Sequence, residues 1–139
     1  MVLVKKYFDN VGKQLRNVLE SQREQIKMAG ETVAESLLSG GILHTFGCGH
    51  AVLPTLDIFS RGGGLVPINP ILAPGPMLWN WTVSQGTRME KELESYGDIL
   101  IDSARVSDED VLLVISTAGS IPVAVEAIIR AKELGAKTV

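Results

Sequence analysis

Apolar residues recur at intervals of three and four along the first 40 residues, which is the spacing of one helical face. The first series consists of Val4, Phe8, Val11, Leu15 and Val18. It predicts a helix over about residues 3–19. Ser21 followed by Glu24 has the form of a capping box, and a second apolar series then continues as far as Gly40 and Gly41. The pattern therefore predicts two helices ahead of the first strand.

Four short apolar segments in the rest of the chain have the length and composition of buried strands. They lie at residues 42–46, 65–68, 110–116 and 136–139. Helical spacing follows the first of them, through Leu53, Leu56 and Phe59. This alternation predicts an α/β fold in which helices cover a parallel sheet. The last segment looks like the start of a strand, so we expect a partner or further chain to complete the sheet.

Two further helices are expected, one before and one after the strand at 110–116. Residues 87–105 have helical composition, with an interruption at Gly97. Pro122 is suited to the first turn of an apolar helix that runs to Leu134, and Gly135 follows it at the position where glycine commonly ends a helix. Ser120 is expected to cap the start of that helix.

Composition narrows the class of protein. The chain has 139 residues, 45% of them hydrophobic, and a formal net charge of −3. One domain is expected at this length, with residues 1–40 as N-terminal helices and 41–139 as an incomplete parallel α/β core. The basic residues are scattered along the chain and form no cluster of the kind that binds nucleic acid. The lone cysteine, Cys48, forms no internal disulfide, and no cysteine–histidine cluster suggests a metal.

The sequence also indicates where the protein is located and whether it needs a cofactor. No apolar run approaches the roughly 20 residues that span a bilayer, and the N-terminus lacks the pattern of a signal peptide. We therefore expect a soluble, cytoplasmic protein with no membrane partner. No metal and no cofactor are expected.

Two glycine- and hydroxyl-containing loops carry the candidate chemistry. Residues 47–50 (GCGH) follow the first strand, and residues 116–120 (STAGS) follow the strand at 110–116. Such loops lie at the carboxyl edge of a parallel sheet, where backbone N–H groups favour an anion, commonly phosphate. Neither loop contains lysine or matches a nucleotide-binding fingerprint, so a smaller phosphate ester is expected. A tight turn for the first loop and simple capping for the second are the structural alternatives.

At FGCGHA and ISTAGSIPVAVEA the chain resembles the SIS (sugar isomerase) domain family. The stretch 7–139, with GGLVPINPI, looks especially similar to uncharacterised SIS-domain proteins related to phosphoheptose isomerases and N-acetylmuramic acid 6-phosphate etherases. The resemblance implies a three-layer, five-stranded, flavodoxin-like parallel sheet, a homodimer formed through helices, and a chain truncated after the strand at 136–139. It also implies a phosphosugar site at Gly47, Cys48, Gly49, His50, Ser116, Thr117, Ala118, Gly119 and Ser120.

Three departures from the family pattern bear on activity. Ala51 stands where similar proteins usually place serine, and Thr117-Ala118 replaces a more usual Asn-Ser or Ser-Ser pair. Arg61 stands at the position that matches, by spacing, the catalytic glutamate of the phosphoheptose isomerases and the etherases. We expect phosphosugar binding and an aldose–ketose phosphosugar isomerase, with a non-catalytic phosphosugar sensor as the alternative.

Three residues are candidates for proton transfer. His50 is placed to protonate a sugar ring oxygen or polarise a carbonyl, or is instead a neutral residue satisfied by the backbone. Asp57, seven residues on, is a candidate base or a solvated carboxylate. Glu90 has the same two interpretations, because it and Glu94 belong to a charge run of the kind that usually forms an exposed face.

The remaining polar and aromatic residues receive structural interpretations. His44 alternates within an apolar strand and is expected to be a packed, hydrogen-bonded core histidine. Cys48 is expected to be a small loop residue rather than a nucleophile. Trp79 and Trp81, in a long loop over residues 73–86, suit either a lid over a sugar face or, by preference, an anchor at a subunit interface.

Overall fold

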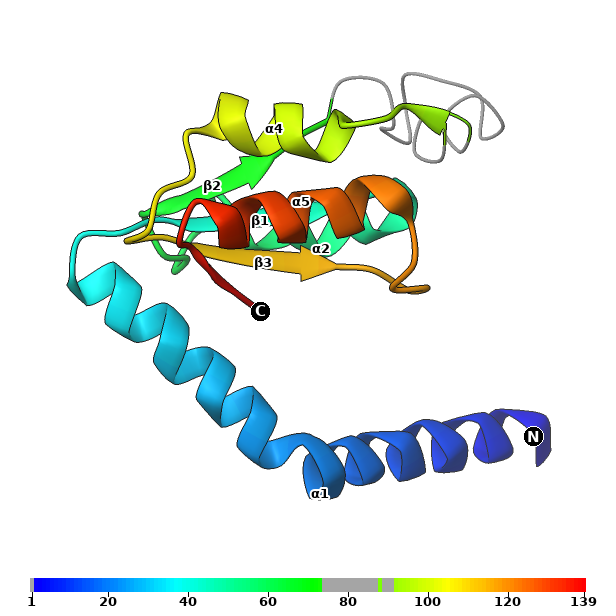
Figure 1. Ribbon diagram of the computed structural model, residues 1–139. Coiled ribbons are helices and arrows are strands. Elements are labelled where there is room, and N and C mark those ends of the chain that lie inside the picture. The colour runs from blue at the N-terminus through cyan, green and yellow to red at the C-terminus, as the bar shows by residue number, and fades with distance from the viewer. Residues whose placement is uncertain (1, 74–87, 89–91) are drawn as a thin grey trace. The chain divides into compact units, whose positions relative to one another are not determined.

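The computed structural model describes residues 2–73, 88 and 92–139 (Figure 1). The chain divides into two units, residues 1–32 and 33–139, and each is described separately. Trp79, Trp81, Glu90 and all but the first residue of the loop predicted at 73–86 lie outside the described residues.

Helix α1 is one continuous helix, Val2–Leu38, so the prediction of two helices is wrong. Ser21 does not cap a second helix, because its hydroxyl donates a hydrogen bond of 2.7 Å to the carbonyl of Asn17 one turn earlier. No glycine or proline stands near Ser21 to end the first helix. Most of the large apolar side chains in the first unit are exposed, and Phe8, for example, is 66% exposed.

The second unit is built on a parallel sheet of four strands among the described residues. These are β1 (Leu43–Gly47), β2 (Ile68–Ile71), β3 (Val111–Ile115) and β4 (Lys137–Thr138). Their order in the sheet is β2-β1-β3-β4, and every pairing is parallel. The predicted α/β class with a parallel sheet is confirmed. The beginning of a strand expected at 136–139 is present as β4.

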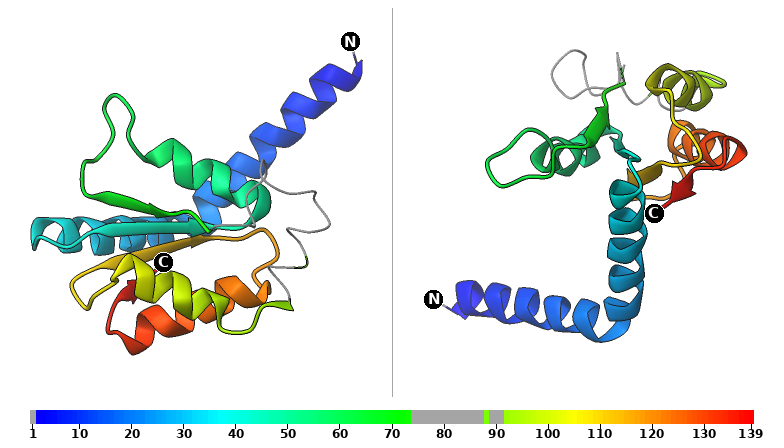
Figure 2. Two further views of the ribbon diagram at one scale, coloured as in Figure 1. Left: turned by 90° about the horizontal axis from the view of Figure 1, so that it is seen from above. Right: turned by 90° about the vertical axis from the view of Figure 1, so that its left-hand side faces the viewer.

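Helices cover both faces of this sheet (Figure 2). The 3-10 helix η1 (Gly49–Ala51) and helix α2 (Val52–Ile58) follow β1, and α2 lies on one face. Helices α4 (Tyr96–Ala104) and α5 (Pro122–Glu133) lie together on the other face. The main core lies beneath α4 and α5 around Phe46 and Ile101, both fully buried. The fold therefore has the expected three layers.

Strand β2 begins where the prediction ended, because Leu65 and Val66 are exposed loop residues and the strand is Ile68–Ile71. The prediction stopped at Asn69-Pro70 since proline has no N–H to give to a ladder. Pro70 nevertheless sits within the strand, where it pairs with Thr45 of β1. β2 is an edge strand of the described sheet, and an edge tolerates the missing donor.

The helix predicted over 87–105 is present as α4 only from Tyr96, because residues 93–95 are not helical. The interruption therefore lies a few residues before Gly97, which belongs to the first turn of α4. Its N–H donates a hydrogen bond of 2.9 Å to a carboxylate oxygen of Glu126 on α5. A Cβ atom at Gly97 would stand 2.5 Å from the Cβ of Glu126 and 2.5 Å from the carbonyl oxygen of Val123. The glycine is therefore needed because α4 and α5 pack in contact at this point.

Candidate functional site

The two predicted loops begin side by side at the carboxyl edge of the sheet. β1 and β3 are neighbours, and Gly47 at the end of β1 is in register with Ile115 at the end of β3. The chain leaves β1 toward α2 on one face and leaves β3 toward α5 on the other (Figure 2). Such a divergence between neighbouring parallel strands is a topological switch point, where α/β proteins bind their ligands.

The first loop turns tightly on its glycines. A Cβ atom at Gly47 would collide with the backbone carbonyl of Ala51, so only glycine fits there. Gly49 has φ +56°, a left-handed conformation that other residues rarely adopt. Cys48 is 9% exposed and joins the hydrophobic core, which agrees with its interpretation as a small loop residue. His50 lies in η1 with its side chain exposed.

The second loop is braced by its own serine. The Ser116 hydroxyl oxygen accepts a hydrogen bond of 3.0 Å from the N–H of Gly119, whose φ is +65°. Residues 117–120 are exposed. Ser120 does not cap α5, contrary to expectation, because the capping position is Ile121 and no side chain hydrogen-bonds there. The loop turn formed by Ser116 ends before Ser120, which leaves the Ser120 side chain at the surface.

Of the two candidate carboxylates, Asp57 and Glu90, only Asp57 belongs to the residues that the structure describes. Asp57 lies near the end of α2 with its side chain 76% exposed, and its carboxylate forms an ion pair of 2.9 Å with Arg61. About five residues of helix, or roughly 7.5 Å of rise, separate it from the start of α2. Glu90 is outside the described residues. Of the three candidates for proton transfer, His50 is therefore the one that belongs to a loop of the site.

Tyr96 is a residue that the sequence analysis missed. It opens α4, packs on the core cluster that contains Cys48, and is partly buried. Burial raises the pKa of its hydroxyl, and the nearby Cys48 raises it further. Tyr96 therefore lies within electrostatic reach of the first loop. Nothing in the local sequence points to it, because the proximity depends on the packing of α4 beside β1 and β2.

His44 is a packed core residue, 1% exposed, as expected. Its Nδ1 accepts a hydrogen bond of 3.0 Å from the side-chain amide of Asn69, which places the ring proton on Nε2. Nε2 lies 3.4 Å from the carboxylate of Asp110 without making a hydrogen bond. Asp110 also accepts hydrogen bonds from the N–H of Ile42 and from Ser107. This group lies at the amino end of the strands, away from the two loops.

Comparison with known proteins identifies the fold and the family. The sequence model described as "SIS domain" matches residues 6–139. The chain belongs to the SIS domain family. The resemblance seen in FGCGHA and ISTAGSIPVAVEA is thus confirmed over nearly the whole chain.

Sequence relatives of this SIS domain carry no assigned activity in their names. A UPF0309 protein of Halalkalibacterium halodurans is 40% identical over 134 residues, covering 96% of this chain and 53% of that protein. A UPF0309 protein of Geobacillus sp. strain WCH70 is 37% identical, covering 99% of this chain and 55% of that protein. The SIS domain described here therefore spans about half the length of the curated relatives it matches.

A solved structure with the same fold is phosphoheptose isomerase GmhA from Neisseria gonorrhoeae. The two superpose with a TM-score of 0.73 at 17% sequence identity, over 97% of this chain and 70% of that one. At this identity the match establishes the shared fold. It confirms the α/β SIS architecture that the two loops suggested.

Two absences hold for the described part of this SIS domain. Within residues 2–73, 88 and 92–139, no three histidine, cysteine or acidic side chains are grouped so that they could hold a metal ion. In the same part of the chain, no helix is both long enough and apolar enough to cross a membrane.

The buried His44 gives this SIS domain a predictable pH dependence. Burial lowers the pKa of His44 below 6.5, although the charge of Asp110 acts in the opposite direction. Below pH 6.5 the unfolded chain therefore takes up a proton here that the folded chain does not, and the free energy of unfolding decreases as the pH falls. Urea unfolding between pH 7.5 and 5.5 should show this decrease.

The ring-proton resonance of His44 provides the direct check. It should report an apparent pKa below 6.5, and a value above 6.5 would contradict the buried neutral imidazole.

Asp110 affects the free energy of unfolding at lower pH than His44 does. Burial would raise its pKa, but hydrogen bonds from Ile42 and Ser107 and the charge of His44 lower it overall, so its stabilising contribution is lost as the pH falls below about 4.

Proposed function

We propose that this SIS domain binds phosphosugars in the crevice between the loop after β1 and the loop after β3. The observation that carries the proposal is the register of Gly47 with Ile115, which starts both loops at the same level of the sheet. Two loops that diverge to opposite faces leave their backbone N–H groups around a common space. The family to which the chain belongs supports a ligand of this class.

The chemistry of the two loops suits a phosphate ester bound by neutral donors. Backbone N–H groups of residues 47–50, 117 and 118, together with the hydroxyls of Ser116, Thr117 and Ser120, are the candidate donors. Hydrogen bonds to a charged phosphate oxygen are about twice as strong as those between neutral groups. The N-terminal end of α5, a helix of 12 residues, adds a favourable dipole beside the second loop. Neither loop contains a lysine or arginine.

Catalysis of an aldose–ketose isomerisation is the specific activity that we propose for this site. In that reaction a base removes the proton from the carbon next to the carbonyl, and an acid protonates the carbonyl oxygen to give an enediol. The base then returns its proton to the former carbonyl carbon, while the hydroxyl on the other carbon gives up its proton to the acid's conjugate base and becomes the new carbonyl. Acid and base are both regenerated, so no atom is gained or lost. His50 would act on the oxygen, because it is exposed in the first loop. Asp57 and Glu90 remain the candidate bases.

A non-catalytic phosphosugar sensor is the second candidate function. It is favoured by the placement of Asp57, because its carboxylate lies near the end of α2 and is engaged by Arg61 at 2.9 Å rather than belonging to either loop. The phosphate-binding crevice would be the same in a sensor and in an isomerase. The difference lies in whether a base is available beside the bound sugar.

We also propose that the protein acts in the cytoplasm as a homodimer paired through α1. The helix exposes large apolar side chains along its first unit, including Val4, Phe8, Leu15 and Val18. A second copy of the helix would cover such a stripe. The single cysteine of the chain suits a reducing compartment.

A thermal-shift screen tests the binding proposal. Heptose, hexosamine and N-acetylmuramic acid 6-phosphates should raise the melting temperature, while the corresponding free sugars should not. A compound that binds is then assayed for isomerisation across the pH range. A pH-dependent rate would support the isomerase, and saturable binding without turnover would support the sensor. If no phosphosugar shifts the melting temperature more than its free sugar does, the proposal is wrong.

A further inference from the structure

Tyr96 lies at the edge of the sheet where both loops begin. Helix α4 starts at Tyr96 and ends at Ala104, and the chain then enters β3 at the amino end of that strand. A helix that leads into a parallel strand runs back from the carboxyl edge of the sheet to the amino edge. The first residue of α4 therefore lies on the same side of the sheet as the loops at 47–50 and 116–120.

The first turn of α4 packs on the first turns of α5, the helix that follows the second loop. A Cβ atom at Gly97 would stand 2.5 Å from the carbonyl oxygen of Val123, near the beginning of α5. The Glu126 carboxylate accepts hydrogen bonds from the N–H of Ser95, at 3.2 Å, and from the N–H of Gly97, at 2.9 Å. The backbone on both sides of Tyr96 is therefore held by α5.

The Tyr96 side chain also packs toward the first loop. It is half-buried and lies against the core cluster that contains Cys48 of that loop and Phe46 of β1. Burial raises the pKa of the Tyr96 hydroxyl, and the charge of the nearby Cys48 raises it further. The hydroxyl therefore stays protonated at neutral pH and can donate a hydrogen bond.

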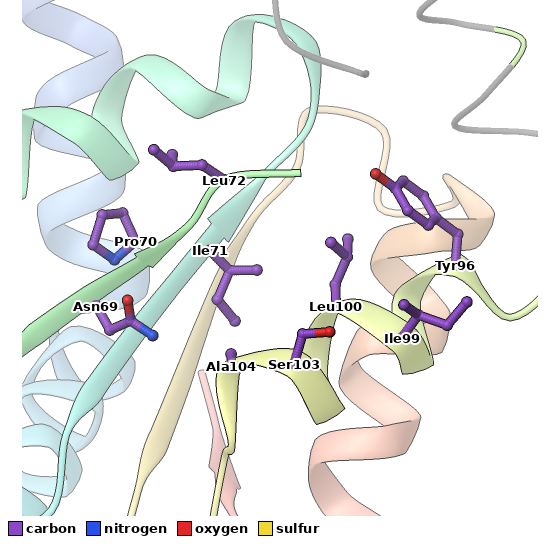
Figure 3. A pocket seen from close by; sticks show the side chains of 9 residues that line it. All are labelled: Asn69, Pro70, Ile71, Leu72, Tyr96, Ile99, Leu100, Ser103 and Ala104. Carbon is purple, nitrogen blue, oxygen red and sulfur yellow. The ribbon is translucent and has the colours of Figure 1, made fainter. Parts of the chain in front are cut away.

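Figure 3 shows Tyr96 at one end of a groove of about 440 Å³ between β2 and α4. The tyrosine side chain points away from the α4 ribbon, with its hydroxyl outermost. The other residues that line the groove belong to β2, the residue after it and the rest of α4, and none of them is charged. Tyr96 thus presents an aromatic ring and one hydroxyl at the end of the groove where α4 begins.

We propose that Tyr96 is a third binding element of the phosphosugar site, where it contacts the sugar while the two loops hold the phosphate. This inference rests on the proposed phosphosugar function and adds to it a residue that recognises the sugar. The ring offers an apolar surface to the C–H groups of the sugar, and the hydroxyl donates a hydrogen bond to a sugar oxygen. Because Tyr96 comes from α4, it approaches the ligand from an element to which neither loop belongs.

Tyr96→Phe tests this contact, because it removes one hydroxyl and keeps the ring in its place. The variant and the parent chain would be titrated with heptose, hexosamine and N-acetylmuramic acid 6-phosphates and with inorganic phosphate, and amide resonances would report the affinities. Affinity for the sugar phosphates that the parent chain binds should fall about 5- to 15-fold, as expected for the loss of one hydrogen bond. Affinity for inorganic phosphate should change less than about twofold.

The matched control is Tyr7→Phe, the same change at the other tyrosine of the chain. Tyr7 is on α1, outside both loops and α4, and is 65% exposed. This control should bind every ligand as the parent chain does. Tyr96→Phe should keep the circular dichroism spectrum of the parent chain, since the ring still packs on the core.

The outcomes separate the tyrosine contact from the site on which it depends. Unchanged affinity of Tyr96→Phe for every sugar phosphate that the parent chain binds would overturn the contact and leave the crevice between the loops in place. An equal loss for sugar phosphates and inorganic phosphate would also overturn it, because the hydroxyl would then act on the phosphate-binding loops and not on the sugar. Failure of the parent chain to bind any of the sugar phosphates would overturn the phosphosugar site and the contact together.

Discussion

A Ser116→Ala/Ser120→Ala double variant is expected to lose at least about 100-fold in affinity for a phosphosugar. Each hydroxyl would donate to a charged phosphate oxygen, and one such hydrogen bond contributes about 1.5–3 kcal/mol. Two of them together correspond to a factor of 100 or more in Kd. Ser116 has a second role, since its oxygen accepts the Gly119 N–H and holds the loop in its turn. Calorimetric titration would measure the loss.

The matched control for this variant is Ser39→Ala. Ser39 is an exposed serine outside both loops, so its replacement should leave the affinity unchanged. The double variant should still fold, because Ser120 is at the surface and the hydrogen bond accepted by Ser116 braces only the exposed turn at Gly119. Unchanged phosphosugar affinity in a folded double variant would show that the second loop does not hold the phosphate.

Gly97→Ala should strongly destabilise the second unit. The new Cβ would stand 2.5 Å from the Cβ of Glu126 and 2.6 Å from the backbone nitrogen of Ala127. Helix α4 must then move away from α5 or distort, at a cost of about 2–3 kcal/mol. For a chain of this size the melting temperature should fall by about 10 °C, as calorimetry or circular dichroism would measure.

Two other glycines serve as controls for the added methyl group. A Cβ at Gly62 would meet no atom within 4 Å, so Gly62→Ala should change stability little. Gly30 lies within α1 and is also open, and there alanine should stabilise the helix by about 0.5–1 kcal/mol. A fall in stability at Gly97 no larger than that at Gly62 would mean that α4 and α5 are not in contact at this point.

The sheet and its loops were predictable because their signals are local. The apolar segments at 42–46 and 110–116 match β1 and β3 to within a residue, and each runs into a glycine loop and a helix. Pro122 and Gly135 marked the bounds of α5 through backbone chemistry that depends on neighbouring residues alone. The carboxyl-edge position of both loops followed from parallel strands, and the register of Gly47 with Ile115 agrees with it.

The features that sequence analysis missed depend on contacts between distant segments. Pro70 is tolerated in β2 because the strand is at an edge, and that position is a property of the whole sheet. The sequence suggests that Gly97 breaks a helix. In the structure the position needs glycine because a side chain there would collide with Glu126, which comes 29 residues later. Ser21 had the sequence of a cap but bonds backward to Asn17 within a longer helix.

The same limitation applies to the candidate site. Tyr96 and the groove between β2 and α4 had no sequence signal, because residues from 69 to 104 are brought together only by packing of the helix on the sheet edge. The pairing of Asp57 with Arg61 follows helical spacing of four residues and was in principle predictable.

The most direct test of the account is a nuclear magnetic resonance titration of the ¹⁵N-labelled chain with the phosphosugar that gives the largest thermal shift. The account predicts saturable changes in the amide resonances of both loops, residues 47–50 and 116–120, at one common Kd, while the free sugar leaves them unchanged. Saturable binding whose shifts bypass both loops, or a response of one loop alone, would contradict a phosphosugar site at the junction of β1 and β3.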